Sequence, residues 1–419
     1  MTDQLVASRS RVHDVDALRG FALSGIFIVN ITFMASGYPG NLAIDPAYVS
    51  ILDDVVRGLS EVFVDMKFYL LFSFLFGYSF TLQMESAAAA RAAFEPRMLR
   101  RIGGLFVIGV LHSVFLYAGD VLTTYAVACL VLFWMRRVGD RTALRVAAIL
   151  YGLVVASLLL GAVFMDVSAL LPSSTEAQAN AERATQAMLG SWGDVIGVHL
   201  DSLGLLVLQS LTLQGPTALA MLLLGMVAGR RRSLADVHRD EPILRRIQLV
   251  GFPIGLAGSV LFAIGGGVGH ILAVAVSLAT APFLSAAYIA TLLRAMHSPR
   301  TSFIRTALAP AGRIALTNYL TQSAIGLLIF TGIGLGAAGT FSPLATVSTA
   351  LIVFTLQLAL SAIWLRWFRY GPAEWILRWI TNAHRPAWRT ALPTTALASD
   401  ESMKAARISR WRDKGRTSS

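Results

Sequence analysis

Four polar side chains that could do chemistry lie inside apolar stretches of this 419-residue chain: Asn30, Lys67, His112 and Gln322. An imidazole titrates near neutral pH and can take or give a proton, so His112 is the first candidate for a general base. The amide of Asn30 could contact a ligand or bond another helix. From the residue types alone, the chemistry indicated is proton transfer at His112.

The four residues are expected to lie at one depth in a membrane. A helical rise of about 1.5 Å per residue places them about 14 to 18 Å from one surface of a core about 30 Å thick. We therefore predict one pocket near the midplane, with Asp65 and Asp120 above it toward the outer mouth. Asp65 is the expected partner of His112, because Asp120 would stand about 12 Å higher on a straight helix.

These residues also have structural interpretations, which the sequence leaves open. Buried amides commonly join helices by hydrogen bonds, and a buried lysine commonly pairs with a carboxylate. The predicted catalytic residues are His112, Asn30 and Asp65, and the predicted substrate pocket contains Lys67, Asp120 and Gln322.

A second candidate site consists of four arginines at the expected cytoplasmic helix ends: Arg19, Arg100, Arg101 and Arg313. Arginine forks bind phosphate through two hydrogen bonds, so this set predicts a phosphate-bearing ligand, with lipid headgroups as the alternative. No Walker loop, GxSxG elbow or zinc-binding spacing is present, and the single Cys129 cannot form an internal disulfide. We expect no metal site.

The composition predicts the elements that position these residues. The chain is 55% hydrophobic and 14% charged, with a net charge of +11, whereas soluble domains carry about 25% charged residues. The basic residues form short clusters between apolar runs, which favours a cytoplasmic membrane face over nucleic-acid binding. The prediction is an all-α polytopic membrane protein with about ten transmembrane helices and both termini cytoplasmic. The expected spans are residues 17–37, 59–83, 102–118, 121–135, 143–165, 203–229, 247–268, 271–293, 312–333 and 343–365.

One transmembrane domain is expected over residues 1–384, followed by a basic cytoplasmic tail over 385–419 that touches anionic lipid. The domain divides into an N-terminal part (1–165), an external loop (166–201) and a C-terminal part (202–384). Within the loop, residues 172–192 favour an amphipathic helix, and Gly215-Pro216 is expected to interrupt the following span.

Several stretches resemble the YeiB-like family of bacterial membrane proteins, also described as domain of unknown function family 418. "DALRGFALSGIFIVNI" is similar to that family's first helix, and "RRIGGLFVIGVLHSVFLYAGDVLTTYA", which contains His112 and Asp120, is similar to its third and fourth. "RYGPAEWILRWIT" resembles its C-terminal signature. The resemblance implies a multi-pass protein of the bacterial inner membrane.

"VDALRGFALSGIFIVN" is also similar to the first helix of transmembrane acyltransferases such as heparan-α-glucosaminide N-acetyltransferase. That resemblance implies acyl-CoA as co-substrate, and Asn30 falls on an active-site asparagine. The histidine that follows in that enzyme is missing here. The expected function is transfer of an acyl group from cytoplasmic acyl-CoA to a hydroxyl or amine of a small-molecule or glycan acceptor. A transporter or exporter of a metabolite or lipid, without chemistry, is the alternative, so the sequence leaves open whether the chain is an enzyme. Membrane lipids are expected partners, nucleic acid is not, and homo-oligomer formation is left open.

Overall fold

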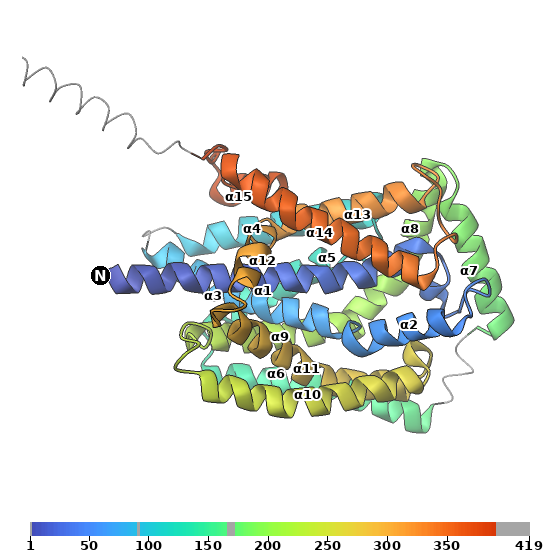
Figure 1. The fold of residues 1–419 in the computed structure, drawn as a ribbon, viewed down its shortest axis with the longest axis horizontal. Helices are drawn as coiled ribbons and strands as arrows, with labels where there is room; N and C mark the ends of the chain where they lie inside the picture. Colours follow the sequence, from blue (N-terminus) through green and yellow to red (C-terminus); the bar gives the residue numbers. More distant parts are fainter. Residues whose placement is uncertain (1, 90–92, 166–171, 391–419) are drawn as a thin grey trace, which may run out of the picture.

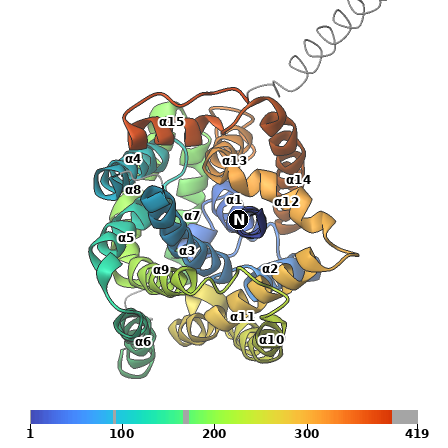
Figure 2. The same cartoon turned by 90° about the vertical axis from the view of Figure 1, so that its left-hand side faces the viewer.

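The structure, a computed structural model, describes residues 2–89, 93–165 and 172–390. Helices lie roughly along one long axis (Figure 1), and the end-on view shows α1 (Thr2–Ala35) in the middle of the bundle with other helices around it (Figure 2). Over the described ranges there is no named strand, only an isolated bridge between Phe368 and Arg389. The predicted all-α class is confirmed.

The remaining elements follow in chain order. They are η1 (Pro39–Asn41), α2 (Ile51–Phe63), α3 (Lys67–Ala89), α4 (Phe94–Phe115), α5 (Leu122–Trp134), η2 (Met135–Arg137), α6 (Asp140–Phe164), α7 (Ser174–Met188), α8 (Trp192–Gln209), η4 (Ser210–Gln214), α9 (Gly215–Arg230), α10 (Glu241–Ile264), η5 (Gly267–Gly269), α11 (Ile271–His297), α12 (Phe303–Arg313), α13 (Ala315–Phe330), α14 (Pro343–Trp367) and α15 (Pro372–Asn382). All ten predicted apolar segments are largely helical. The segment expected at 59–83 is interrupted at Met66, whose φ is +65°, so it forms the end of α2 and most of α3.

Seven helical stretches of the described chain are long and apolar enough to cross a membrane: His13–Ala35, Phe94–Phe115, Asp140–Phe164, Trp192–Arg230, Glu241–Ile264, Ile271–His297 and Pro343–Trp367. The helix α13 is apolar but shorter. Large apolar side chains cover the outward faces, as on α6, where Leu153 is 62% and Phe164 79% exposed. Such a surface suits lipid and not water. The count of ten spans and the cytoplasmic termini remain predictions.

The helices α3 and α9 pack at backbone contact because glycines face the crossing. A Cβ added to Gly225 would lie 2.0 Å from the carbonyl oxygen of Phe74, and one added to Gly77 would lie 2.0 Å from that of Leu222. Gly229, one turn beyond Gly225, faces the side chain of Thr81, whose Oγ1 would lie 2.0 Å from an added Cβ. Small residues at this spacing let membrane helices approach closely. The crossing fixes α3, whose opposite side helps to form an internal cavity.

Two predicted features of the loops and tail can be compared with the structure. The helix expected within 172–192 is present as α7, which begins with a capping box between Ser173 and Glu176. Residues 385–390 do not leave the bundle, because the Trp388 ring packs against Phe368 and Trp375. The predicted tail therefore begins later than residue 385. Its remainder from residue 391, including Trp411, and residues 166–171 of the predicted external loop lie outside the described residues.

Candidate functional site

A cavity of about 550 Å³ opens between α1, α3, α4, α13 and α15. The start of α4 and the helix α15, which carry several of its lining residues, lie toward the end of the bundle from which α1 starts, here called the basic end (Figure 1). Five arginines line it: Arg19, Arg97, Arg101, Arg313 and Arg378. Volumes of about 300–1,000 Å³ are typical of small-molecule sites. The cavity is therefore large enough for an extended ligand.

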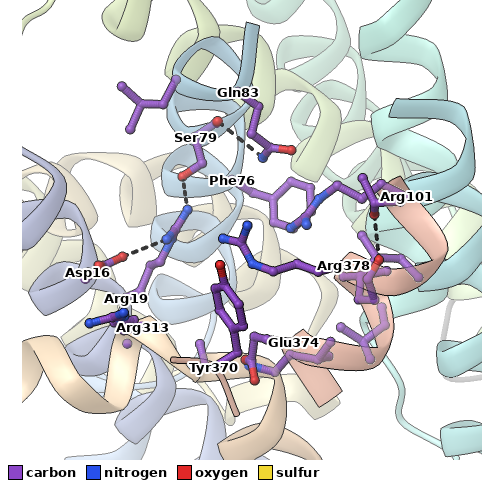
Figure 3. Close-up of a pocket in the computed structure, with 18 of the residues that line it drawn as sticks. Asp16, Arg19, Phe76, Ser79, Gln83, Arg101, Arg313, Tyr370, Glu374 and Arg378 are labelled. Atoms are coloured by element: carbon purple, nitrogen blue, oxygen red, sulfur yellow. Dashed lines mark hydrogen bonds and ion pairs between the residues drawn. The ribbon is translucent and has the colours of Figure 1, made fainter. Parts of the chain in front are cut away.

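Three of these arginines point toward one another across the cavity. Figure 3 shows the guanidinium groups of Arg19, Arg101 and Arg378 converging from α1, α4 and α15, whereas Arg313 lies at the margin. Arg19 donates a 2.9 Å hydrogen bond to Asp16 and another to the Ser79 hydroxyl. Within the described ranges, no ion pair joins Arg101 or Arg378 to a carboxylate. Unpaired guanidinium groups facing a common space favour an anionic ligand.

The carboxylates in the cavity wall are already engaged. Asp16 pairs with Arg19, as stated above. Glu374 of α15 accepts hydrogen bonds from the Leu316 amide at 2.7 Å and the Thr317 hydroxyl at 2.5 Å, so it caps the first turn of α13. Burial raises the pKa of Glu374, although its hydrogen bonds with Thr317 oppose that shift. The cavity consequently keeps an excess of positive charge.

The inner part of the cavity is apolar. Leu23 and Ile26 of α1, Phe72 of α3 and Leu105 of α4 line it, and Tyr319 closes it at its deep end. Along α4, eight residues separate Arg97 from Leu105, which corresponds to about 12 Å at the helical rise. A ligand that fits this shape carries anionic groups at one end and an extended apolar or weakly polar part at the other.

His112 lies behind this deep end. Its ring packs against Tyr319 with 4.8 Å between centroids, and both the His112 and Asp120 side chains are almost fully buried. His112 Nδ1 is 3.1 Å from Asp120 Oδ1, a close contact that does not have the geometry of a hydrogen bond. His112 Nε2 is 2.8 Å from the Ser323 hydroxyl. The imidazole thus lies between a carboxylate and a hydroxyl. It packs against Tyr319, which lines the cavity.

The partner of His112 differs from the predicted one, which was Asp65. The 12 Å separation between His112 and Asp120 assumed a straight helix, but α4 ends at Phe115 and the chain turns back before α5. Gly109 permits the return, because a Cβ there would lie 2.8 Å from Asp120 Oδ2. The turn between α4 and α5 therefore places Asp120 beside the imidazole of His112.

The other predicted pocket residues do not join His112 in one hydrogen-bonded cluster. Lys67 is fully buried and donates to the Glu61 carbonyl at 2.5 Å, with Asp65 as a neighbouring charge. Gln322 donates to Gln357 of α14 at 2.8 Å, which is the interhelical role that the sequence left open. The predicted meeting of Asn30, Lys67, His112 and Gln322 is therefore not what the contacts show.

Asn30 is 9% exposed and lies one turn beyond the cavity residue Ile26 on α1. Across the described part of the chain, no hydrogen bond joins its amide to another group. Its amide atoms are not among the fully buried polar atoms without a partner, and Asn30 does not line the cavity, so its contact with a ligand stays a prediction.

Three of the four predicted arginines line the cavity, and phosphate binding by them stays a prediction. Arg19, Arg101 and Arg313 line the cavity, but Arg100 does not; it is exposed and donates to the Pro96 carbonyl. Consecutive helical residues are about 100° apart, so Arg100 and Arg101 face different sides of α4. Arg97 and Arg378 were not among the residues predicted to bind phosphate. Both lie in basic stretches, but only the packing of α15 on α4 places them at the cavity.

The fold and this cavity define a class: a polytopic helical membrane protein with an arginine-lined internal site and a buried histidine–carboxylate pair behind it. A family model described as "Protein of unknown function (DUF418)" matches residues 228–384. The chain belongs to this family, the YeiB-like family, because relatives match nearly all of it.

Two of those relatives come from different bacteria. The uncharacterized protein YxaH of Bacillus subtilis (strain 168) is 31% identical over 402 residues, covering 90% of this chain and 95% of the relative. The uncharacterized protein YeiB of Escherichia coli (strain K12) is 26% identical over 391 residues, covering 88% and 95%. The matches therefore include the helices that build the cavity.

Proposed function

We propose that the protein is a membrane acyltransferase that takes an acyl group from acyl-CoA and passes it to a hydroxyl or amine of a small-molecule or glycan acceptor. One observation supports this most strongly. The cavity is cationic at its mouth, apolar along its length, and ends one residue layer from a histidine paired with a carboxylate.

Each part of acyl-CoA has a matching region. Its phosphates fit the guanidinium groups of Arg19, Arg101 and Arg378. Its extended pantetheine arm suits the apolar part, which would bring the thioester to Tyr319. There His112 would serve as general base, with Asp120 orienting the ring, and Asn30 would polarise the thioester carbonyl.

The proposal places the basic end of the bundle in the cytoplasm of a bacterial inner membrane, where acyl-CoA is available. The acceptor would be reached at or beyond the membrane. A transporter without chemistry is the rival, because charged residues within a bundle can also mark a permeation path.

Binding of coenzyme A to the purified full-length protein, measured by calorimetry, tests the proposal. A charge-assisted hydrogen bond contributes about 1.5–3 kcal/mol, so Arg101→Gln should weaken binding about 10- to 150-fold. Arg100→Gln is the matched control, because that side chain is on the same helix but outside the cavity. Pantetheine, which lacks the phosphates, should bind wild type and Arg101→Gln alike.

Two outcomes would count against this function. Absence of coenzyme A binding at millimolar concentration would reject it and favour the transporter. Equal weakening by Arg100→Gln and Arg101→Gln would show diffuse attraction to a basic surface, and not a site in the cavity.

A further inference from the structure

Ser323 of α13 completes a serine–histidine–aspartate series that none of the sequence motifs indicated. Its Oγ is 2.8 Å from His112 Nε2, and His112 Nδ1 is 3.1 Å from Asp120 Oδ1. The three residues come from α13, α4 and the turn before α5. The order of contacts, hydroxyl to imidazole to carboxylate, is that of an activated serine nucleophile.

The hydroxyl of Ser323 behaves differently from many serines in these helices. Ser73, Ser79 and Ser259 each donate to the backbone carbonyl four residues earlier. That bond is the usual way to satisfy a hydroxyl within a helix. Ser323 instead has His112 Nε2 as its hydrogen-bond partner. The tautomer of His112 therefore decides whether Ser323 donates or accepts in this bond.

The surroundings of Asp120 favour the tautomer that such a base needs. Asp120 Oδ2 accepts from the Thr123 amide at 2.7 Å and the Thr123 hydroxyl at 2.9 Å, which stabilises the carboxylate. A carboxylate beside Nδ1 favours the proton on Nδ1, which leaves Nε2 free to accept. Ser323 is then the donor in its bond to His112.

We propose that Ser323 carries the acyl group as an ester between two half-reactions, an inference that rests on the proposed acyl-CoA function. In the first half, Ser323 Oγ attacks the thioester carbonyl while its proton passes to His112 Nε2. The C–S bond breaks, an O–acyl bond forms, and the proton leaves with the thiol of coenzyme A. In the second half, an acceptor hydroxyl or amine attacks the ester carbonyl and gives its proton to His112. The bond between Ser323 Oγ and the acyl carbon breaks, the acyl–acceptor bond forms, and the proton passes from His112 to Ser323 Oγ.

A covalent intermediate suits the limited volume of this cavity. A volume of about 550 Å³ is shared between the arginine mouth and the apolar part, so donor and acceptor need not be held together if coenzyme A leaves first. Ser323 is 2% exposed, and Tyr319, one turn earlier on α13, stands at the cavity wall. The first half-reaction therefore requires the Tyr319 side chain to move aside when the thioester arrives.

Isotope exchange tests the intermediate without knowledge of the acceptor. Purified full-length protein is incubated with acetyl-CoA and labelled coenzyme A, and transfer of label into acetyl-CoA is measured. A serine ester makes this exchange possible with no acceptor present. Peptide mass spectrometry should then find one acetyl group on Ser323, released by hydroxylamine.

Matched variants distinguish a catalytic from a positioning role. Ser323→Ala and His112→Gln should abolish exchange and adduct while coenzyme A still binds. Ser113→Ala is the control, because Ser113 is buried beside His112 but donates to the Val110 carbonyl, and it should exchange normally. Ser323→Cys should restore an adduct, now a thioester on residue 323.

Coenzyme A binding without exchange in the wild type would reject the serine ester and leave the acyltransferase proposal intact. Exchange that persists in Ser323→Ala would show that this hydroxyl only positions His112. If coenzyme A does not bind at all, the proposed function itself fails first.

Discussion

Replacing Gly225 of α9 by alanine should destabilise the bundle by more than most single methyl additions. The added Cβ would stand 2.0 Å from the Phe74 carbonyl oxygen and 2.8 Å from the Tyr78 amide nitrogen, both backbone atoms that cannot rotate away. An ordinary contact begins near 3.5 Å, so α3 and α9 must separate by about 1.5 Å or bend. Overpacking of this kind costs about 1–3 kcal/mol, and the loss of backbone contact along the crossing adds to it.

Two further glycines form a graded comparison with Gly225. At Gly229 the added Cβ would meet Thr81 Oγ1 at 2.0 Å, but a side chain can change rotamer, so Gly229→Ala should cost less. At Gly103 in α4 nothing lies within 4 Å, so alanine there should stabilise the helix by about 0.5–1 kcal/mol. The expected order of stability is Gly103→Ala, wild type, Gly229→Ala and then Gly225→Ala.

The assay is the fraction of monodisperse protein that remains after heating in detergent, read by size-exclusion chromatography as an apparent midpoint. Because α3 lines the cavity through Phe72 and Phe76, Gly225→Ala should also weaken coenzyme A binding. A midpoint for Gly225→Ala equal to that of Gly103→Ala would refute the close crossing of α3 and α9.

Two other predictions concern orientation and pH. In a background lacking Cys129, an impermeant thiol reagent applied to intact cells should label Gln178→Cys in α7 but not Asp236→Cys; labelling at residue 236 would reverse the predicted orientation. Burial raises the pKa of Glu374, so the folded protein holds that proton more tightly than the unfolded chain. This contribution favours folding at low pH and is lost as the pH rises from the ordinary glutamate range to the raised pKa. Glu374→Gln removes this contribution. As the pH rises through that range, the thermal midpoint of the variant should therefore increase relative to that of the wild type. A difference between the two midpoints that does not change with pH would contradict the reasoning.

Much of the fold was predictable because the apolar runs that favour helices in lipid are visible in short stretches of the sequence. Apolar runs of sufficient length predict helices in lipid, and all ten expected segments are largely helical. The break before α3 was missed, since Met66 adopts a positive φ without a glycine or proline to signal it. The close crossing of α3 and α9 had a readable signal in the spacing of Gly225 and Gly229.

The candidate site was predictable only in part, because depth along a helix says nothing about direction around it. Arg19 and Arg101 were identified from their position at helix ends, and both line the cavity. The pairing of His112 with Asp120 depends on a chain reversal that a straight-helix estimate excluded. No sequence signal indicated the contact of Ser323 with His112, since a serine in an apolar helix usually donates a hydrogen bond to the backbone of its own helix.

The cavity wall contributed by Tyr370–Asn382 has a consequence for biosynthesis. Arg19 and Arg101 emerge from the ribosome early, whereas Glu374 and Arg378 follow only after α14. Until α15 packs on α4 and Glu374 caps α13, the cavity lacks the wall formed by α15, so the arginines of α1 and α4 are not enclosed. Nascent chains at that stage would expose a basic groove to the lipid headgroups beside the insertion machinery. On the proposed function, coenzyme A binding would require completed assembly, and polypeptides truncated before residue 370 should insert into the membrane yet fail to retain coenzyme A.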